Sequence, residues 1–440
     1  MKFDLIIHNG TLITVNAGFD IIPNGIVCVR NGTIAEVSER VAGAPLPPAA
    51  ETIDARGGIV MPGLVNTHTH LPMTLFRGLA DDLPLMDWLN GTIFPAEAAH
   101  IRPETAFWGA QLACAEMILA GTTTCCDGYF HEDAVARAVQ ASGMRAVLGQ
   151  GVIDFPAPGV PDPDKNIEQA ERFVETWQGA GPLISAAVFC HSPYTCSGET
   201  LKRAKSLARR KNVLFQIHTA ETRTERDQSL KAHGASPVRY LDDLGLLDAG
   251  TLLVHAVWTD AADVGRIAKT GAAISHNPES NMKLASGIAP VGEYLAAGIR
   301  VGLGTDGCAS NNNLDLFQEM DTAAKLHKVS TLDPTVMDAR TVIRMATAAG
   351  ADAIGLGEVT GSLEIGKQAD VIILDTATPH MTPLYHPASQ IVYAAKASDV
   401  RTVIVGGRVL MSGGNIATLD LERISTEIDV ISHRIKERQP

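Results

Sequence analysis

Short apolar runs alternate with longer segments of helical periodicity over most of the chain, from about residue 63 to residue 363. The runs lie at residues 146–149, 184–188, 213–217, 251–254, 272–275 and 300–304. Repeated strand and helix alternation over such a length is typical of parallel βα units, and a closed (β/α)8 barrel is the simplest single-domain arrangement of them. We therefore predict an α/β fold in which residues 63–363 form a TIM-type barrel.

The two ends of the chain have a different pattern. Stretches rich in β-branched residues, such as 11–15 and 25–29, are separated by turn pairs such as Asn31-Gly32, which is typical of hairpins in a small sheet. Similar stretches return at residues 369–374 and 400–410. We predict that residues 1–62 and 364–440 together form a small β-sandwich domain, with a helix at the C-terminus.

Charge and cysteine content restrict the partners and the compartment. The 36 basic and 49 acidic residues give a net charge of −13, which would repel nucleic acid or an anionic membrane surface and suits a small substrate. The seven cysteines lack the spacing of a disulfide framework or a zinc ribbon. No secretion signal is visible, and no apolar run approaches the roughly 20 residues that cross a bilayer. We expect a cytoplasmic protein with reduced thiols and no membrane or nucleic-acid partner.

Reactive side chains directly follow the apolar runs. In a (β/α)8 barrel the chemistry lies at the C-terminal ends of the strands, and an apolar core avoids polar groups that have no task there. The residues at these positions are His68, His70, His191, His218, His255, His276 and Asp306. Their placement predicts an active site at one end of the barrel.

His68 and His70 form a His-x-His pair, so their side chains leave a strand on the same face and can bind one ion. Taken alone, the pair could also be two partly exposed histidines. With His218 and Asp306 from later strand ends, it makes a set of three histidines and one carboxylate that leaves room for a water molecule. We predict a zinc site, with iron(II) or manganese as alternatives on the same ligands.

Several stretches resemble the metal-dependent amidohydrolase superfamily. They are residues 62–70, 216–222, 254–256, 275–284 and 304–307, and residues 72–78, 85–89 and 310–313 add a resemblance to its 5'-methylthioadenosine/S-adenosylhomocysteine deaminases. The resemblance implies that His68, His70, His218 and Asp306 bind one zinc ion per subunit, since no lysine follows the matching runs to bridge a second metal. It is compatible with a homo-oligomer.

The resemblance also implies a reaction, the hydrolytic removal of the 6-amino group of an adenosine thioether with release of ammonia. Glu221 is expected to carry a proton to the ring nitrogen and to contact the substrate, unless it is only a solvated acid at a helix start. Asp306 is expected to accept a proton from the attacking water. His255 is expected to stabilise the attacking hydroxide, or else is held by its neighbours. His276 is either catalytic or a donor that fixes its loop.

Further residues are candidates for contact with a nucleoside. The resemblance points to Glu97 as acceptor for the ribose hydroxyls and to His191, while Trp88 either covers the substrate or belongs to the core. Some relatives have an arginine near the position that Gln150 occupies in this chain, and that arginine meets the polar tail of the substrate. This chain has no arginine at that position. The neighbouring cysteines at positions 125 and 126 have no activating base beside them and are expected to be buried thiols.

Two other functions remain open on the sequence. A guanine or cytosine deaminase or a triazine chlorohydrolase would share much of the metal set, and only pocket residues would distinguish them. A catalytically silent barrel that acts as a binding protein would have no need to retain the metal ligands together with Glu221. Glu97 and His191 favour a nucleoside.

Overall fold

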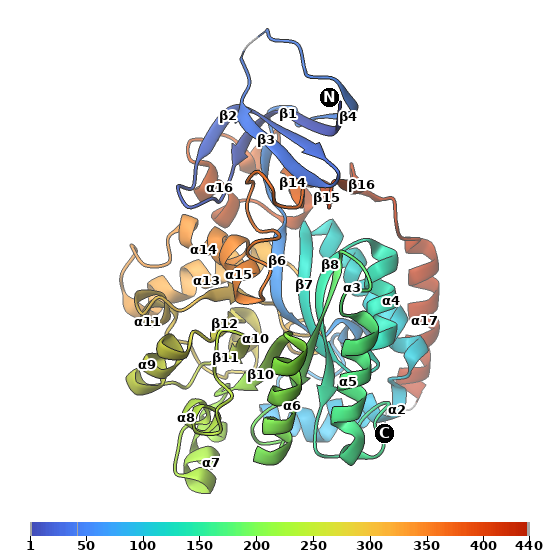
Figure 1. Cartoon of the computed structure of the whole chain (residues 1–440), viewed down its shortest axis with the longest axis vertical. Coiled ribbons are helices and arrows are strands. Elements are labelled where there is room, and N and C mark those ends of the chain that lie inside the picture. Colours follow the sequence, from blue (N-terminus) through green and yellow to red (C-terminus); the bar gives the residue numbers. More distant parts are fainter. Residues whose placement is uncertain (1, 42, 438–440) are drawn as a thin grey trace. The chain divides into compact units, whose positions relative to one another are not determined.

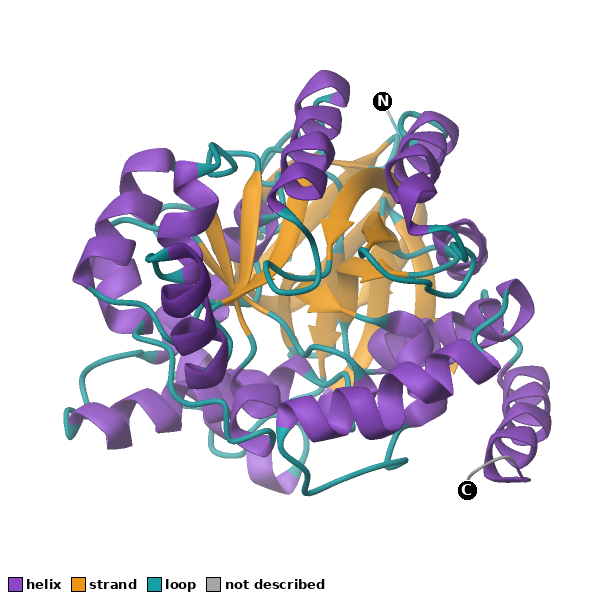
Figure 2. Cartoon of the chain, turned by 90° about the horizontal axis from the view of Figure 1, so that it is seen from below, coloured by secondary structure: helices purple, strands orange, loops and turns teal. Residues whose placement is uncertain are grey.

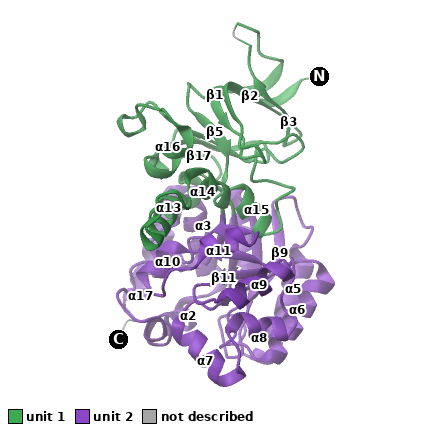
Figure 3. Cartoon of the chain, turned by 90° about the vertical axis from the view of Figure 1, so that its left-hand side faces the viewer, with its two compact units in different colours: residues 1–65, 116–124, 315–418 green, residues 66–115, 125–314, 419–440 purple. Residues whose placement is uncertain are grey.

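The computed structural model describes residues 2–41 and 43–437. Packing divides the chain into two compact units, which Figure 3 draws in different colours. One unit contains residues 1–65, 116–124 and 315–418, and the other contains residues 66–115, 125–314 and 419–440. Each unit is therefore assembled from segments that are distant in the sequence.

Eight parallel strands form one sheet in the order β13-β12-β11-β10-β9-β8-β7-β6. They are β6 (Leu64–Thr69), β7 (Thr122–Tyr129), β8 (Arg145–Val152), β9 (Ile184–Cys190), β10 (Leu214–Thr219), β11 (Thr251–His255), β12 (Ala273–His276) and β13 (Val301–Leu303). Nearly every residue in these strands is buried, as expected of a parallel sheet with both faces covered. The predicted (β/α)8 barrel is confirmed.

Hydrogen bonds connect the last strand of this sheet to the first. The backbone N–H of Asp306 donates to the carbonyl of His68 over 3.0 Å, and the side chain of Asn66 bonds both the N–H and the hydroxyl of Thr305. A Cβ at Gly304 would lie 2.9 Å from the backbone nitrogen of His68 and closer still to two side chains. Glycine at this position lets the two strand ends approach.

Helices lie outside the parallel sheet (Figure 2). Helices α4 (Glu132–Ser142) and α5 (Asn166–Trp177) pack on β8, and α5 and α6 (Gly198–Lys211) pack on β9. Helix α6 starts at Ser197, whose hydroxyl accepts the N–H of Thr200, and it ends in three basic residues that suit the negative end of a helix. Local sequence therefore sets where the covering helices begin and end.

The remaining helices are mostly short. The unit with residues 66–115, 125–314 and 419–440 contains η1 (Leu71–Phe76), α1 (Leu85–Trp88), η2 (Leu89–Ile93), α2 (Phe94–His100), η3 (Pro163–Lys165), α7 (Arg223–His233), α8 (Pro237–Asp243), α9 (Ala261–Thr270), α10 (Pro278–Lys283), α11 (Val291–Ala296), α12 (Cys308–Asn311) and α17 (Leu421–Glu437). The other unit contains α13 (Leu316–Thr331), α14 (Ala339–Met345), α15 (Ala348–Ala353), η4 (Pro379–Met381), α16 (Pro387–Tyr393) and η5 (Ala397–Asp399). Helix α3 (Pro103–Leu119) runs from one unit into the other. No helix among the described residues is long and apolar enough to cross a membrane.

The two ends of the chain share a second, mostly antiparallel sheet of nine strands. Its strands are β1 (Phe3–Ile13), β2 (Ile21–Arg30), β3 (Thr33–Glu39), β4 (Ala49–Asp54), β5 (Ile59–Pro62), β14 (Val371–Leu374), β15 (Val400–Val405), β16 (Arg408–Ser412) and β17 (Asn415–Ile416). Strand β5 pairs with β14, so the blue and orange strands of Figure 1 are neighbours. The prediction of a separate β-rich part built from both chain ends is confirmed.

The turn between β2 and β3 is the Asn-Gly pair singled out in the sequence. Asn31 and Gly32 have φ angles of 51° and 76°, which a two-residue hairpin turn of this kind requires at both central positions. The hydrophobic face of this sheet packs into one core, in which Ile7, Val29 and Ile373 are buried. Successive residues of β1 and β2 are buried as well, and Ile6, Ile26 and Cys28 form a second apolar cluster.

Candidate active site

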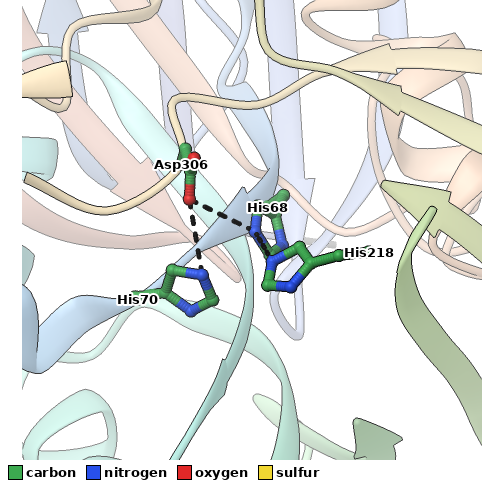
Figure 4. Close-up of side chains that lie close together, drawn as sticks. All are labelled: His68, His70, His218 and Asp306. Carbon is green, nitrogen blue, oxygen red and sulfur yellow. Dashed lines mark hydrogen bonds and ion pairs between the residues drawn. The ribbon is translucent and has the colours of Figure 1, made fainter. Parts of the chain in front are cut away.

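Four side chains from three strand ends converge on one point. His68 and His70 come from the end of β6, His218 from β10, and Asp306 follows β13. One ligand atom from each lies within 4.8 Å of the others (Figure 4). Nε2 of His68 and Nε2 of His70 each lie 3.4 Å from Oδ1 of Asp306, and the Nε2 atoms of His218 and His68 are 3.1 Å apart. The predicted ligand set is thus brought together.

The donor atoms fit a divalent metal ion. Nδ1 of His70 lies 2.6 Å from the carbonyl oxygen of Gly128, so Nδ1 carries the proton and the lone pair of Nε2 points to the centre of the cluster. Burial is the main reason that the pKa of His68 falls to about 4, and it also lowers the pKa of His218 well below the usual value. Neutral imidazoles are the form that binds metals. Nitrogen and carboxylate donors in this number suit zinc and related ions.

The carboxylate of Asp306 is held by its surroundings. Its Oδ2 accepts hydrogen bonds from the hydroxyls of Ser280 and Ser310 over 2.7 and 3.0 Å, and its Oδ1 accepts the N–H of Gly307. Sequence reasoning missed both serines, although Ser280 lies in the matching stretch 275–284 and Ser310 in the stretch 310–313. These donors stabilise the ionised form that a metal ligand needs.

Glu221 lies in the turn that follows β10. Its Oε2 is 3.8 Å from Nε2 of His255, and its Oε1 is 3.4 Å from the hydroxyl of Ser286. Burial raises the pKa of the Glu221 carboxyl. Glu221 is therefore a buried acid inside the site. It is not a solvated acid at a helix start.

A second acid, Glu225, sets the position of Glu221. Its two carboxyl oxygens accept the backbone N–H groups of Ala220 and Glu221 over 2.8 and 2.7 Å. Sequence reasoning missed Glu225. The available signal was the pattern Thr222-x-x-Glu225, which marks a helix start, and the hydroxyl of Thr222 does cap α7.

His255 ends β11 and is almost fully buried. Its Nδ1 lies 2.9 Å from Oδ1 of Asn281 and 3.3 Å from Nδ2 of Asn277. The shorter contact favours an Nδ1–H that donates to Asn281, which leaves the lone pair of Nε2 on the side of Glu221. His276 is buried at the end of β12, and it is not among the residues that line the cavity beside the cluster.

A small cavity opens beside the four ligands. It measures about 50 Å³ and is lined by His70, Met73, Leu85, Trp88, Leu89, His191, Tyr194, His218, Glu221, His255, Leu284, Asp306 and Ser310. Ligand pockets commonly measure about 300 to 1,000 Å³. This cavity is smaller than the usual size of a ligand pocket.

Trp88 and His191 both line this cavity, as the sequence predicted for substrate contacts. The indole N–H of Trp88 donates to the carbonyl of Ala80, and the ring also packs in an apolar cluster. Nδ1 of His191 lies 3.0 Å from the hydroxyl of Thr195, and burial lowers the pKa of His191 to about 3. His191 is therefore neutral at ordinary pH, and its Nδ1 is engaged by the protein.

Glu97 lies on α2 and does not line the cavity. Its Oε1 accepts the hydroxyl of Tyr129 over 2.6 Å, and the ring of Tyr129 is 6.0 Å from that of His70. Burial raises the pKa of Glu97 to about 7, although the hydrogen bond from Tyr129 opposes the shift. Glu97 is 3% exposed, so it is not an exposed glutamate at a helix start.

Gln150 and the two adjacent cysteines take no part in the cluster. Oε1 of Gln150 accepts the N–H of Glu132, so its amide is used within the protein. All seven cysteines are unpaired and buried. Burial raises the pKa of Cys125 and of Cys126 well above the usual value, as expected of inert thiols.

The chain is similar to proteins of known name over almost its full length. A family model described as the amidohydrolase family matches residues 59–410. The 5-methylthioadenosine/S-adenosylhomocysteine deaminase of Syntrophobacter fumaroxidans is 47% identical over 99% of each chain. The 5'-deoxyadenosine deaminase of Methanosarcina acetivorans is 45% identical over 96% of each chain.

Solved structures agree with these matches. The crystal structure of an adenosine deaminase from Xanthomonas campestris with bound zinc has a TM-score of 0.96 and 38% identity, and the match covers 99% of each chain. The atrazine chlorohydrolase TrzN from Arthrobacter aurescens, also with zinc, has a TM-score of 0.90 at 23% identity, over 97% of this chain and all of that one. At that identity the second match shows a shared fold alone.

The site and the matches lead to one conclusion about the class of protein. A four-residue metal cluster lies at the strand ends of the barrel, and the family model covers most of the chain. The predicted superfamily and the prediction of a metal-dependent hydrolase that acts on C–N bonds are confirmed. The chain belongs to the amidohydrolase family.

Proposed function

We propose that this protein is a zinc-dependent hydrolytic deaminase that converts the 6-amino group of an adenosine thioether, 5'-methylthioadenosine or S-adenosylhomocysteine, to the inosine form with release of ammonia. The observation that carries the proposal is the buried carboxyl of Glu221, which stands 3.8 Å from His255 and beside a complete metal cluster. Relatives at 44 to 47% identity are named 5-methylthioadenosine/S-adenosylhomocysteine deaminases, which supports the choice of substrate.

The reaction exchanges an amine for oxygen at one ring carbon. A divalent metal held by His68, His70, His218 and Asp306 would supply an acidified water as nucleophile near neutral pH. Glu221 would carry one proton to the ring nitrogen next to the carbon that is attacked. Asp306 would carry the second proton to the amine, which would leave as ammonia, so that the product carries a carbonyl.

The protein groups are suited to these proton transfers. Burial raises the pKa of Glu221, which helps the carboxyl to hold a proton and release it to a ring nitrogen. We assign Nε2 of His255 to orient the attacking oxygen and to stabilise the tetrahedral centre. For His276 we choose the second of its two roles, a support of its loop, because its neighbour Asn277 reaches His255.

We assign three residues to the rest of the nucleoside. Glu97 would accept the ribose hydroxyls, with Tyr129 holding the carboxyl in place. His191 would contact the nucleoside from the cavity wall, and Trp88 would cover it. Leu85 and Trp88 lie in the short helix α1, which continues directly into the π-helix η2.

A second candidate substrate is 5'-deoxyadenosine. Four relatives at 45 to 46% identity carry that name. The cavity lining contains no lysine or arginine among the described residues, and the amide of Gln150 is bonded to the backbone. A substrate with an uncharged 5' end would need no cationic partner here.

We extend the proposal to the setting of the enzyme. It would bind one zinc ion per subunit, work in the cytoplasm as a possible homo-oligomer, and bind neither nucleic acid nor membranes. Its barrel would span residues 63–363, with a small domain of residues 1–62 and 364–440. Strand β5 ends at Pro62 and β6 begins at Leu64, which supports the first of these limits. The compact units divide the rest of the chain differently, since residues 315–363 belong to the unit of the chain ends and residues 419–437 to the other unit.

The test is ammonia release by the zinc-loaded protein from 5'-methylthioadenosine, S-adenosylhomocysteine, 5'-deoxyadenosine, adenosine, guanine and cytosine, with chloride release from a chlorotriazine. We expect turnover of the adenosines that carry a modified 5' end. Activity confined to guanine, cytosine or the triazine would overturn the substrate. No turnover of any compound with zinc bound would favour the catalytically silent barrel.

A further inference from the structure

Two buried carboxyl groups lie together behind the metal cluster. Asp127 is in β7, and Glu132 is the first residue of α4. Both residues are completely buried. The proposed reaction uses neither of them, and burying two acids without a task costs stability.

One oxygen of Asp127 holds the chain on both sides of the metal ligand His70. Its Oδ1 accepts the hydroxyl of Thr69 and the backbone N–H of Leu71, each over 2.7 Å. The next residue, Gly128, accepts the Nδ1–H of His70 through its carbonyl. Asp127 and Gly128 together therefore fix three successive residues, with His70 in the middle.

The other side of Asp127 faces Glu132. Among the described residues, Oδ2 of Asp127 and both carboxyl oxygens of Glu132 find no hydrogen-bond donor if both groups are ionised. The two carboxyl groups are within hydrogen-bonding reach of each other. Backbone groups of Tyr129 and Gly149 also lie near Glu132, but they form no hydrogen bond of good geometry with it.

A single proton on one of the two carboxyl groups removes the repulsion between them. Two buried carboxylates in contact repel each other and cannot both stay ionised, whereas a protonated partner can donate to the ionised one. Oδ1 of Asp127 accepts two hydrogen bonds that stabilise its ionised form, whereas neither carboxyl oxygen of Glu132 has a donor, so Glu132 is the group that keeps the proton. Burial, which raises the pKa of the Glu132 carboxyl, acts in the same direction. Asp127 then stays the acceptor that Thr69 and Leu71 require.

We propose that Asp127 and Glu132 form an acid pair that positions His70 for metal binding, in which the Glu132 O–H donates to Oδ2 of Asp127. Both are positioning residues, since they act on the ligand through Thr69, Leu71 and Gly128. The proposal depends on the metal cluster alone and is independent of which ring amine the enzyme removes.

The test compares zinc affinities of the full-length protein, measured by competition with a chromophoric chelator. Glu132→Leu has a similar volume but no donor, and we expect it to weaken zinc binding by about 10- to 100-fold, the usual effect of losing a partner behind a metal ligand. Glu132→Gln keeps a donor in its side-chain amide and should retain zinc affinity. The absorption spectrum of the cobalt-substituted protein should change in Glu132→Leu alone.

A matched control separates this effect from a general loss of stability. Asp263 is also fully buried in the same unit, where it accepts hydrogen bonds from Ser236 and from the backbone N–H of Asp260. Asp263→Leu should lower the melting temperature and leave zinc affinity unchanged.

Three results would overturn the proposal. Wild-type zinc affinity in Glu132→Leu would show that the pair does not position His70. Equal weakening in Glu132→Gln and Glu132→Leu would show that no donor is needed. If Glu132→Leu does not fold, Asp127→Asn decides the matter: its Oδ1 can still accept from Thr69 and Leu71 and its amide can donate to an ionised Glu132, so a loss of zinc affinity there would contradict the acid pair.

Discussion

At the scale of single residues, the partner of each histidine decides which of its nitrogens is available. In His70, His191 and His255 the Nδ1 atom is engaged by a carbonyl, a hydroxyl and an amide oxygen respectively. Nε2 is the nitrogen that these contacts leave for a metal ion or a substrate. The sequence predicted these histidines, but the choice of nitrogen depends on contacts with residues elsewhere in the chain.

Glu221→Gln should keep the metal and lose turnover. Glu221 is not among the four ligands, so zinc content by elemental analysis should match the wild type. Loss of the proton carrier should lower kcat by about 10²- to 10⁴-fold. Ser286→Ala, which removes only a long hydrogen bond to Glu221, serves as the control and should have a small effect. Unchanged turnover in Glu221→Gln would remove this residue from the reaction.

Recognition of the ribose should depend on pH through Glu97. Its pKa in the folded protein is about 7, raised from 4.5 by burial, so the carboxylate that would accept the ribose hydroxyls is lost as the pH falls through 7. We expect KM for a nucleoside to rise by up to about tenfold per pH unit below that value. In Glu97→Gln the KM should be higher and nearly constant from about pH 8 to about pH 6.

The free base adenine is the control for this prediction, because it has no ribose. Glu97→Ala should raise KM for nucleosides far more than for adenine. Equal effects on both substrates would argue against a ribose contact by Glu97.

At the scale of elements, the strand ends leave the sheet through unusual backbone conformations. Ala220, His255 and Asp306 all have positive φ angles, of 52°, 72° and 62°, although none is glycine. Such conformations are uncommon for residues with a side chain and concentrate at functional sites. Here they occur at the residue before Glu221, at His255 and at Asp306, which are the strand ends that carry the site.

The turn after β10 provides a prediction at this scale. Glu225→Ala would leave the buried N–H groups of Ala220 and Glu221 without their acceptors, at about 1 to 3 kcal/mol each. We expect lower stability together with a fall in kcat, because Glu221 loses its fixed position. Ammonia release and chemical unfolding measure the two effects.

Thr222→Ala provides the comparison from the same helix. It removes the cap of α7, which should cost about 1 kcal/mol of unfolding free energy. Because it leaves the contacts of Glu225 intact, kcat should stay close to wild type. An equal fall of kcat in both variants would mean that turnover follows the stability of α7 and not the position of Glu221.

At the scale of the whole molecule, the metal cluster connects distant parts of the barrel. Its ligands come from β6, from β10 and from the turn after β13, and β6 and β13 are the first and last strands of the parallel sheet. A metal ion at this position would connect the first strand of the barrel, β6, to the turn after the last strand, β13. Removal of the metal should therefore affect the stability of the fold as well as its activity.

We expect a chelator to lower the melting temperature of the zinc-loaded protein. Binding of a ligand to the folded state alone stabilises it by about 4 kcal/mol when the ligand is at about 1,000 times its Kd. His68→Ala should melt at the same temperature with and without chelator, and zinc should not raise it. If the melting temperature of the wild-type protein is the same with and without chelator, the metal makes no contribution to the stability of the fold.

Much of the fold could be predicted from hydrophobic periodicity and from the residues of the turns. The alternation between residues 63 and 363 gave the barrel because a parallel strand buried on both faces must be apolar throughout. His68 and His70 were predicted to be functional because burying a polar pair in an apolar core without partners costs free energy. Asn31-Gly32 predicted its hairpin because only residues that tolerate positive φ can make that turn.

The tertiary structure alone decided the contacts that hold these residues in place. Thr69 meets Asp127 across 58 positions, Ser280 meets Asp306 across 26, and Glu132 lies behind Asp127 with no local pattern to mark it. Glu225 looked like an ordinary residue of a helix start, yet its carboxyl fixes Glu221. The sequence by itself determined which residues reach the strand ends, because periodicity is a local property. Their distances, partners and protonation depend on how distant strands pack, and only the folded chain contains that information.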